Sequence, residues 1–381
     1  MKHKVLLKVN SIARPIYGEH RYISGIGRST MHLIDAIYNL NKNELSFDLE
    51  LYASGISCLG INGKNLNYPY YQFLIPQRFG NRMSNIESFY VKKVLKPSIL
   101  HIPHNYDSII NKVPSIVTIH DTYEYDNLIR IKNKDNNCIK NINNWVEAVN
   151  NSVGIVTCSQ ASKNDIINRF NVKSEKITVI HWGVSRKLFR ILTESEIDTV
   201  LKKFKIYKPY FLAVSCAHER KNIKQLLKSF KLFSEKNKDI NLYLLWSQPA
   251  VEILKEYAEL INNGRIQFLK YVRDIELVAL YNGALCTMFP SKYEGFGFPI
   301  IESYACGTPV MTCRNSSLVE IGGPLADYVG EDNCDEMIFV MEKYSQNHNK
   351  STFQRNIASY VDNFNWSNKA AEYINLYQKY L

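Results

Sequence analysis

The chain has 381 residues, of which 45% are hydrophobic and 22% charged, a composition that excludes a disordered protein. This length exceeds one ordinary core and predicts two domains of about 180 residues each. The net charge of +11 favours an anionic partner, such as a diphosphate ligand or an anionic membrane surface. We expect no nucleic acid, because no recognised nucleic-acid motif accompanies the charge.

The first residues form a short charged lead into a strand, without a signal-peptide core. No run approaches the roughly 18 continuous apolar residues that span a bilayer. Eight cysteines are scattered singly, without a Cys-x-x-Cys pair or a Cys/His metal spacing. We therefore expect reduced core cysteines, no metal site and a cytoplasmic protein, with peripheral attachment to the inner face of the membrane as an option.

Short apolar strands alternate with helical patterns along the chain, which is typical of parallel sheets covered by helices. In the first half, strands are expected at 5–9, 47–52, 99–102, 115–119, 154–158 and 177–180, and helices at 31–40, 87–94, 139–150 and 162–170. A charged, weakly patterned helix at 186–208 is interpreted as the interdomain connection. Further strands are expected at 211–214, 242–245, 266–269, 285–289 and 309–311. The prediction is two doubly wound α/β domains, with ligands at the carboxyl ends of the strands, facing a cleft.

A glycine-rich loop, Ser24-Gly25-Ile26-Gly27-Arg28, precedes the first expected helix. A dinucleotide-binding fingerprint needs its glycine turn directly after a strand. This loop comes about fifteen residues after the strand that ends at Val9, so the pattern disfavours a dehydrogenase.

Residues 77–96 mix cations with aromatic residues, among them Arg78, Phe89, Lys92 and Lys93. An amphipathic basic helix of this kind can lie on an anionic bilayer. The ordinary alternative, a core-facing stripe with solvated lysines, stays open. Our hypothesis is that this segment helps the protein to reach a lipid-linked acceptor.

His120 stands at the end of the apolar strand Val117-Thr118-Ile119. A single histidine in such a place is usually structural. Its unperturbed pKa would also let it exchange protons near neutral pH, although we do not assign it as a base.

Arg220 and Lys221 follow the strand expected at 211–214 and open the next helix. Two adjacent cations at a helix N-terminus add charge to a dipole that already suits phosphate. The alternative is an exposed basic helix start.

The most informative stretch places Glu294 and Glu302 eight residues apart around the loop Gly295-Phe296-Gly297. The glycines let backbone N–H groups approach a ligand, and the apolar run that follows predicts a helix start. Glu302 is expected about two turns inside that helix, so that the carboxylates grip two ends of one extended polar ligand. The alternative is a glycine turn with two solvated glutamates.

This stretch resembles the E-x7-E signature of retaining glycosyltransferases of family 4, and the chain is similar to bacterial surface-polysaccharide mannosyltransferases of that family. The resemblance implies the GT-B fold, in which two Rossmann-like domains face a central cleft. It implies an acceptor domain at 1–187, a donor domain at 188–364 and a final helix at 365–381 that packs back on the first domain.

The resemblance also implies roles for residues of the donor domain. Glu302 would bind the ribose hydroxyls of a sugar nucleotide. Glu294 and the backbone of the loop Gly295, Phe296 and Gly297 would face the donor sugar.

Further roles follow from the same resemblance. Arg220 and Lys221 would hold the diphosphate in place of a metal ion, and Val272 would line the nucleobase site. In the first domain, His120 would contact the donor sugar or line the reaction centre. Gly25, Gly27 and Arg28 would lie near the donor phosphate and the acceptor.

The sequence therefore predicts a metal-independent retaining hexosyltransferase that uses a nucleoside diphosphate sugar and a glycan or polyprenyl-diphosphate-linked acceptor. We expect same-face attack, in which a donor phosphate oxygen takes the acceptor proton. GDP-mannose is favoured over UDP sugars, because the loop from Gly25 to Arg28 resembles that of mannosyltransferases. Three alternatives stay open: a GT-B sugar-nucleotide epimerase, a glycoside hydrolase that uses Glu294 and Glu302, and a non-catalytic sugar-nucleotide-binding subunit.

Overall fold

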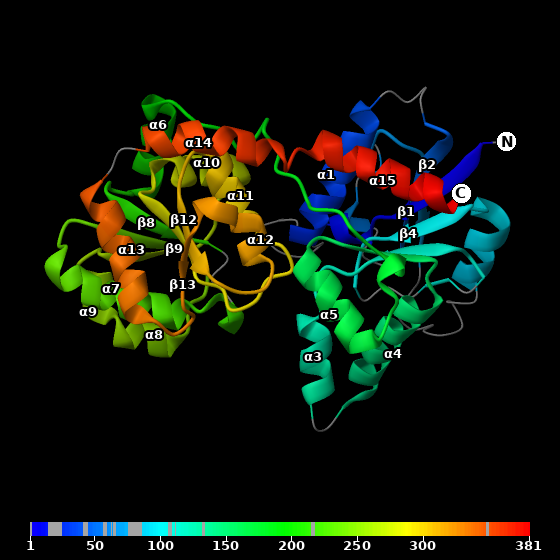
Figure 1. The fold of residues 1–381 in the computed structure, drawn as a ribbon, viewed down its shortest axis with the longest axis horizontal. Helices are drawn as coiled ribbons and strands as arrows, with labels where there is room; N and C mark the ends of the chain where they lie inside the picture. The colour runs from blue at the N-terminus through cyan, green and yellow to red at the C-terminus, as the bar shows by residue number, and fades with distance from the viewer. Residues whose placement is uncertain are drawn as a thin grey trace. The chain divides into compact units, whose positions relative to one another are not determined.

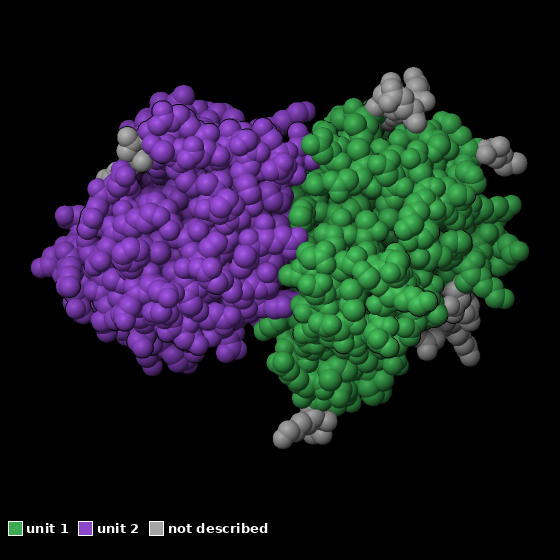
Figure 2. Space-filling view, viewed as in Figure 1, with its two compact units in different colours: residues 1–183, 366–381 green, residues 184–365 purple. Residues whose placement is uncertain are grey.

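The computed structural model describes residues 2–13, 25–40, 45–55, 59–61, 63, 66–74, 86–105, 109–110, 112–131, 134–214, 218–347 and 350–381. The chain divides into two compact units, which Figure 2 colours separately. The first unit consists of Met1–Gly183 and Trp366–Leu381, and the second consists of Val184–Asn365. The sequence placed the corresponding boundaries after residues 187 and 364.

The first unit contains, within the described residues, seven parallel strands in the order β3-β2-β1-β4-β5-β6-β7. They are β1 (His3–Lys8), β2 (Phe47–Ser54), β3 (Tyr70–Phe73), β4 (Ile99–Ile102), β5 (Ser115–Thr118), β6 (Gly154–Thr157) and β7 (Ile177–Val179). Strands β4, β5 and β6 are buried along their whole length, as expected for strands covered on both faces. Helices α1 (Gly25–Asn39), α3 (Tyr123–Arg130), α4 (Asn136–Asn151) and α5 (Gln160–Phe170) accompany the sheet (Figure 1).

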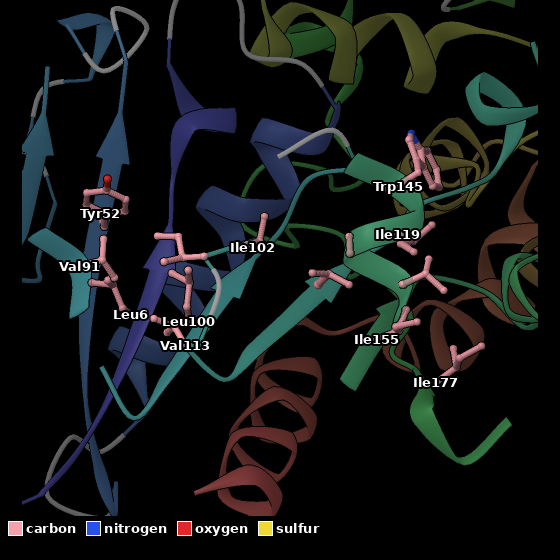
Figure 3. Close-up of a cluster of buried hydrophobic side chains, with 14 of the residues drawn as sticks. Leu6, Tyr52, Val91, Leu100, Ile102, Val113, Ile119, Trp145, Ile155 and Ile177 are labelled. Atoms are coloured by element: carbon pink, nitrogen blue, oxygen red, sulfur yellow. The ribbon is translucent and has the colours of Figure 1, made fainter. Parts of the chain in front are cut away.

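One apolar cluster fills the space between the first sheet and its helices (Figure 3). It combines strand residues such as Leu6 and Leu100 with Trp145 of α4. Val91 and Leu95 also belong to it, and they come from the single π-helical turn η6 (Val91–Leu95). The basic segment around residue 90 is therefore anchored in the core by two apolar side chains.

The C-terminal helix α15 (Trp366–Tyr380) belongs to the first unit and packs against α1. Its Tyr377 hydroxyl lies 2.7 Å from His101 Nδ1 in β4, and His101 Nε2 lies 2.8 Å from Thr118 Oγ1 in β5. Burial lowers the pKa of His101 to about 3, so the ring is neutral near neutral pH. Helix α15 is thus bonded to the centre of the first sheet.

The second unit contains, again within the described residues, six parallel strands in the order β10-β9-β8-β11-β12-β13. The strands are β8 (Tyr210–Ala213), β9 (Asn241–Leu245), β10 (Ile266–Leu269), β11 (Cys286–Phe289), β12 (Val310–Cys313) and β13 (Asp327–Val329). The helices are α6 (Glu194–Phe204), α7 (Ile223–Lys236), α8 (Val251–Glu256), α9 (Ala258–Asn262), α10 (Asp274–Gly283), α11 (Phe298–Ala305), α12 (Leu318–Gly322), α13 (Cys334–Gln346) and α14 (Ser351–Asp362) (Figure 1). The predicted doubly wound α/β architecture is confirmed for both units.

The segment at 186–208 differs from its prediction as an interdomain connection. From Val184 onward the chain belongs to the second unit, and α6 packs against α10. A capping box between Thr193 and Glu196 begins this helix, and Ile197 and Leu201 are buried. Helix α6 is therefore a covering helix of the second sheet.

No helix in the described part of the chain combines the length and the apolar character needed to cross a membrane.

Candidate functional site

The order in which strands are added to the second sheet reverses between β8 and β11. From β8 the chain proceeds to β9 and β10 on one side, whereas β11, β12 and β13 lie on the other. Open parallel sheets bind ligands at the carboxyl ends of the strands beside such a switch point, because the two connecting loops diverge there. Arg220 and Lys221 follow β8, and Glu294 follows β11. The topology therefore brings three predicted site residues to one place.

Arg220 and Lys221 lie on one 3-10 turn, η8 (Glu219–Lys221), ahead of the long helix α7. The Arg220 N–H donates to His218 Nδ1 at 3.2 Å. Asn222 then adopts the left-handed conformation, with φ of 58°, which this residue type tolerates, and α7 begins at Ile223. The doublet was expected to open the helix itself; it is held instead on the turn before it.

Glu294 binds both cations. Arg220 Nη1 donates to Glu294 Oε2 at 2.8 Å, and Lys221 Nζ donates to Glu294 Oε1 at 2.5 Å. Ser291 Oγ donates to the same Oε1 at 2.6 Å. Burial alone would raise the pKa of the Glu294 carboxyl, but Lys221, Arg220 and the serine hydroxyl hold it below its ordinary value. Glu294 is therefore an ionised, buried carboxylate near neutral pH.

Hydrogen bonds to backbone carbonyls join the loops that carry these three side chains. The Lys292 N–H donates to the Arg220 carbonyl at 2.7 Å, and Arg220 Nη1 donates to the Tyr293 carbonyl at 2.8 Å. Ser291 Oγ lies 3.1 Å from the Arg220 carbonyl. The loop after β11 therefore fixes where the cations after β8 stand.

The loop Gly295-Phe296-Gly297 leads into α11. Gly297 has a φ of 113°, a conformation that favours glycine, and a Cβ there would lie 3.3 Å from Leu318 Cδ2. The Ser317 hydroxyl lies 2.8 Å from both the Glu294 and the Phe296 carbonyls, and the Glu294 N–H donates to Ser316 Oγ at 3.1 Å. The loop after β12 thus clamps the glycine loop.

Glu302 has different partners from Glu294. It is the fifth residue of α11, so it lies about one turn inside the helix rather than the expected two. The Tyr281 hydroxyl of α10 donates to Glu302 Oε2 at 3.1 Å, and the Glu302 side chain is buried. The structure therefore joins Arg220, Lys221 and Glu294 directly, and it fixes Glu302 from α10.

His120 lies at the carboxyl end of β5 in the first unit. Its Nε2 lies 3.1 Å from the Pro103 carbonyl, which only accepts, so Nε2 carries the ring proton. Among the described residues, the buried Nδ1 has no hydrogen-bond partner. Burial, with a contribution from His104, lowers the pKa of His120 to about 3. The ring is therefore neutral near neutral pH, with its proton on Nε2.

Gly25, Gly27 and Arg28 lie in the first turn of α1, and not in a loop before it. The Ser29 and Thr30 hydroxyls donate to the Ile26 carbonyl at 2.7 and 2.9 Å, within that helix. The expected helix start at residue 31 is therefore six residues late. Ser24 lies outside the described residues.

Two family models match the chain, one mainly in the first unit and one in the second. "Glycosyltransferase Family 4" matches residues 43–188, and "Glycosyl transferases group 1" matches residues 196–338. The second match contains the Arg220–Lys221–Glu294 cluster. The chain belongs to glycosyltransferase family 4.

Mannosyltransferases are among the proteins similar to this chain. The O-antigen chain mannosyltransferase B of Escherichia coli is 28% identical over 240 residues, 61% of this chain and 62% of that protein. The O-antigen chain mannosyltransferase RfbU of Salmonella typhimurium is 32% identical over 181 residues, 47% of each chain. The chain thus matches between about half and three fifths of the length of these relatives.

Solved structures show the same fold over nearly the whole chain. Sucrose-phosphate synthase of Thermosynechococcus elongatus superimposes with a TM-score of 0.73 at 16% identity, covering 99% of both chains. HepE of Anabaena, solved with UDP and glucose, gives a TM-score of 0.71 at 15% identity, covering 99% of this chain and 100% of that one. This family 4 chain has the GT-B fold.

Val272, the expected nucleobase residue of this family 4 chain, lies between β10 and α10, two strands from β8. The neighbouring Arg273 donates to Glu276 Oε1 at 2.7 Å, and Lys203 of α6 donates to the same oxygen. The Arg273 hydrogen bond, followed by that of Lys203, lowers the pKa of Glu276 to about 2 against the opposing effect of burial. Paired charges therefore fix the start of α10 beside Val272.

Several polar residues of the site were not found from the sequence: Ser291, Ser316 and Ser317. The run Asn315-Ser316-Ser317 directly after β12 was an available signal, because such residues often bond to nearby backbone groups. The bond from Tyr281 to Glu302 was not predicted, because it joins two helices.

Proposed function

We propose that this chain is a metal-independent retaining glycosyltransferase that moves a hexose from a nucleoside diphosphate sugar to a glycan acceptor. The observation that carries the proposal is the cluster of Arg220, Lys221 and Glu294 at the switch point of the second sheet. Two cations against one carboxylate leave an excess of positive charge at the place where α/β sheets bind ligands. A diphosphate has the charge that complements it.

In this proposal the two cations bind the donor diphosphate and stabilise it as it departs. Stabilisation of developing charge by fixed cations typically contributes about 3 kcal/mol to the lowering of a barrier. A donor phosphate oxygen takes the acceptor proton while the acceptor attacks the same face of the sugar. Arg220 and Lys221 supply the positive charge that a metal ion provides in other phosphate sites.

The charge state of Glu294 argues against its use as the acid of a glycoside hydrolase. Such an enzyme needs one carboxylic acid that protonates the leaving oxygen, with its pKa raised. The pKa of Glu294 is lowered, and its carboxylate is bound to two cations. Glu302 is hydrogen-bonded by Tyr281 on a different helix.

GDP-mannose is the proposed donor, and a surface-polysaccharide glycan or its polyprenyl-diphosphate-linked precursor is the proposed acceptor. The support is the similarity to O-antigen mannosyltransferases. UDP sugars are the competing donors, since HepE is a structural neighbour solved with UDP.

A thermal-shift screen with GDP, UDP and ADP tests the donor site, because a ligand that binds only the folded state raises the melting temperature. We expect GDP to give the largest shift and to keep it in EDTA. GDP-[14C]mannose should then label a lipid-linked or oligosaccharide acceptor. The proposal fails if no nucleoside diphosphate shifts the transition, or if EDTA abolishes the transfer.

We further propose that residues 86–96 of the first unit rest on an anionic membrane surface. Ile86, Phe89 and Val94 are 50%, 60% and 59% exposed, next to Lys93 and Lys96, which are also exposed. An apolar strip flanked by lysines fits the interface of an anionic bilayer. The first part of the predicted patch, 77–85, lies outside the described residues.

Sedimentation with vesicles tests this surface. The wild-type protein should pellet with phosphatidylglycerol vesicles at low salt and much less with phosphatidylcholine vesicles. Phe89→Ser/Val94→Ser should reduce the bound fraction several-fold, whereas Phe339→Ser, an exposed phenylalanine of the second unit, should leave it unchanged. Equal binding by all three proteins would refute the assignment.

A further inference from the structure

We infer that Asn222 is a positioning residue of the donor site, because its side chain ties the turn that carries Arg220 and Lys221 to the loop after β13. The inference rests on the proposed function, in which these two cations bind the donor diphosphate. It adds a buried asparagine and a fourth loop to the residues that hold the cluster.

The backbone of Asn222 joins the cation turn to the helix that follows. Its N–H donates to the Glu219 carbonyl at 3.0 Å, which closes the 3-10 turn, and its carbonyl accepts from the Leu226 N–H at 3.3 Å, in the first turn of α7. Between these two bonds Asn222 is left-handed, with φ of 58° and ψ of 33°. Glycine and, to a lesser degree, asparagine and aspartate adopt this conformation at low cost. The place of the cations relative to α7 therefore depends on residue 222.

The side chain of Asn222 binds outside its own helix. An asparagine directly before a helix usually accepts a hydrogen bond from an N–H of the first turn. Within the described residues this side chain makes no such cap, and its Nδ2 donates instead to the Glu331 carbonyl at 2.6 Å. Asn222 is only 6% exposed, so removal of its amide would leave a polar group of the interior without its partner. The bond therefore fixes the end of the cation turn to the loop after β13.

This bond also lies where two helices start. Helices α7 and α13 pack against each other (Figure 1), and Asn222 and Glu331 stand shortly before their first residues. A purely structural role would be to hold these helices together. An effect on ligand affinity in a folded protein distinguishes the positioning role from it.

Glu331 extends the connection to the other loops of the site. Its Oε1 accepts from Asn315 Nδ2 at 2.7 Å, and the same Nδ2 donates to the Ser291 carbonyl at 3.2 Å. Asn315 follows β12, and Ser291 follows β11 and donates to Glu294 Oε1. The loops after β8, β11, β12 and β13 are thus joined at the carboxyl ends of four neighbouring strands. Loss of the Asn222 side chain would remove the bond between the cation turn and the last of these loops.

A diphosphate needs both cations in place at once. A displacement of about 1 Å in a positioning group can lower a rate by about a hundred-fold. Inorganic pyrophosphate has the two phosphates of the donor but no sugar and no base. Its affinity therefore reports on the place of the cations alone.

Asn222→Gly removes the side-chain bond and keeps the backbone, since glycine adopts the left-handed conformation freely. Asn171→Gly is the matched control, because Asn171 is also left-handed, with φ of 52°, at the end of α5 in the first unit. The two variants make the same chemical change at a similar φ, and only Asn222 adjoins the cations. Melting temperatures verify that each protein is folded.

The experiment measures the affinities of the full chain for inorganic pyrophosphate and GDP by titration calorimetry. We expect Asn222→Gly to weaken both ligands about five- to ten-fold, and Asn171→Gly to leave them within about two-fold of the wild type. In the Lys221→Met background, Asn222→Gly should weaken them by no more than about two-fold, because residues that act through one another are not additive. In transfer from GDP-mannose the KM should rise, whereas a loss of folded protein would lower the apparent kcat alone.

Asn315→Ala tests the same connection at a partly exposed residue. It removes both bonds of the Asn315 amide and leaves Asn222 in place, so we expect it to weaken pyrophosphate about three-fold. Asn237→Ala is its matched control, because Asn237 Nδ2 donates to the Phe233 carbonyl at 3.1 Å at the other end of α7. This control should leave the affinity within about two-fold of the wild type.

The outcomes separate this inference from the proposed function. If the wild type binds none of GDP, UDP, ADP and pyrophosphate, both are wrong. If it binds them and folded Asn222→Gly loses no more affinity for pyrophosphate than Asn171→Gly, the proposed function stands and the positioning role is wrong. If Asn222→Gly does not fold, Asn315→Ala decides, and an affinity equal to that of Asn237→Ala overturns the role.

Discussion

Replacement of Lys221 by methionine is a direct test of the charge at the switch point. Lys221 and Arg220 face one carboxylate, so this substitution takes the net charge of the cluster from positive to neutral while the apolar stem of the side chain stays. A departing diphosphate would then meet no excess positive charge. The loss of one such group raises a barrier by about 2 to 4 kcal/mol. We therefore expect kcat for sugar transfer to fall about 30- to 1,000-fold.

The assay is the initial rate of transfer from GDP-mannose, with melting temperatures to establish that each protein is folded. Lys292→Met is the matched control, because Lys292 belongs to the same loop as Glu294 and its pair with Asp332 is exposed on both sides. An exposed pair contributes less than about 1 kcal/mol, so this control should stay within about three-fold of wild type. Equal rates for folded Lys221→Met and wild type would refute the reasoning, as would equal losses in the two variants.

Three further predictions concern stability. The pKa of Glu276 is lowered from 4.5 to about 2, so its ion pairs stabilise the fold above about pH 4.5 and lose this effect as the pH falls toward 2. Because its partners are largely exposed, Glu276→Gln should lower the free energy of unfolding by only about 1 to 2 kcal/mol at pH 7. If urea unfolding shows the same loss for this variant at pH 3 as at pH 7, the prediction is wrong. Burial lowers the pKa of His101 from 6.5 to about 3, so the free energy of unfolding of the wild type should fall as the pH drops below 6.5. Folded His101→Gln should lose less stability than the wild type between pH 7 and pH 5. An equal fall of the urea midpoint in both proteins would contradict this prediction. Gly297 has a φ of 113°, so Gly297→Ala should lower the free energy of unfolding by about 1 to 2 kcal/mol and also weaken the binding of GDP. Gly264, at φ 78° and away from the site, supplies the control: Gly264→Ala should lower stability without changing the affinity for GDP. Unchanged GDP affinity in Gly297→Ala would contradict the role of the loop.

The sequence predicted the strands well where apolar residues run without interruption, as in β4 and β10, whose bounds match. It missed β3 (Tyr70–Phe73), an edge strand without a fully buried residue, and α3 (Tyr123–Arg130), a helix that also lacks one. Strand β3 has no buried face, and α3 has its apolar residues on one side but is short and polar overall. Strand β13 (Asp327–Val329), also missed, has only three residues, and no helix was predicted over α13 or α14.

The candidate site was partly predictable for a related reason. Strand ends identify the loops, and a switch point brings the loops after β8 and β11 together. The residue types of Arg220 and Lys221 left an exposed basic helix start open, and the resemblance to the family gave these residues and Glu294 their roles. Which donor binds which oxygen depends on contacts between distant segments. The bond from Tyr281 to Glu302 and the 3-10 turn under the cations are of this kind.

Helix α15 has a consequence for synthesis of the chain. The first unit is built from two pieces, and the whole second unit lies between them in the sequence. A ribosome releases the segment that supplies Tyr377 to His101 only after the second sheet has emerged. The first unit is therefore begun first and completed last. A stop codon directly after Asn365 would remove α15 from the first unit and leave every residue of the second unit in place.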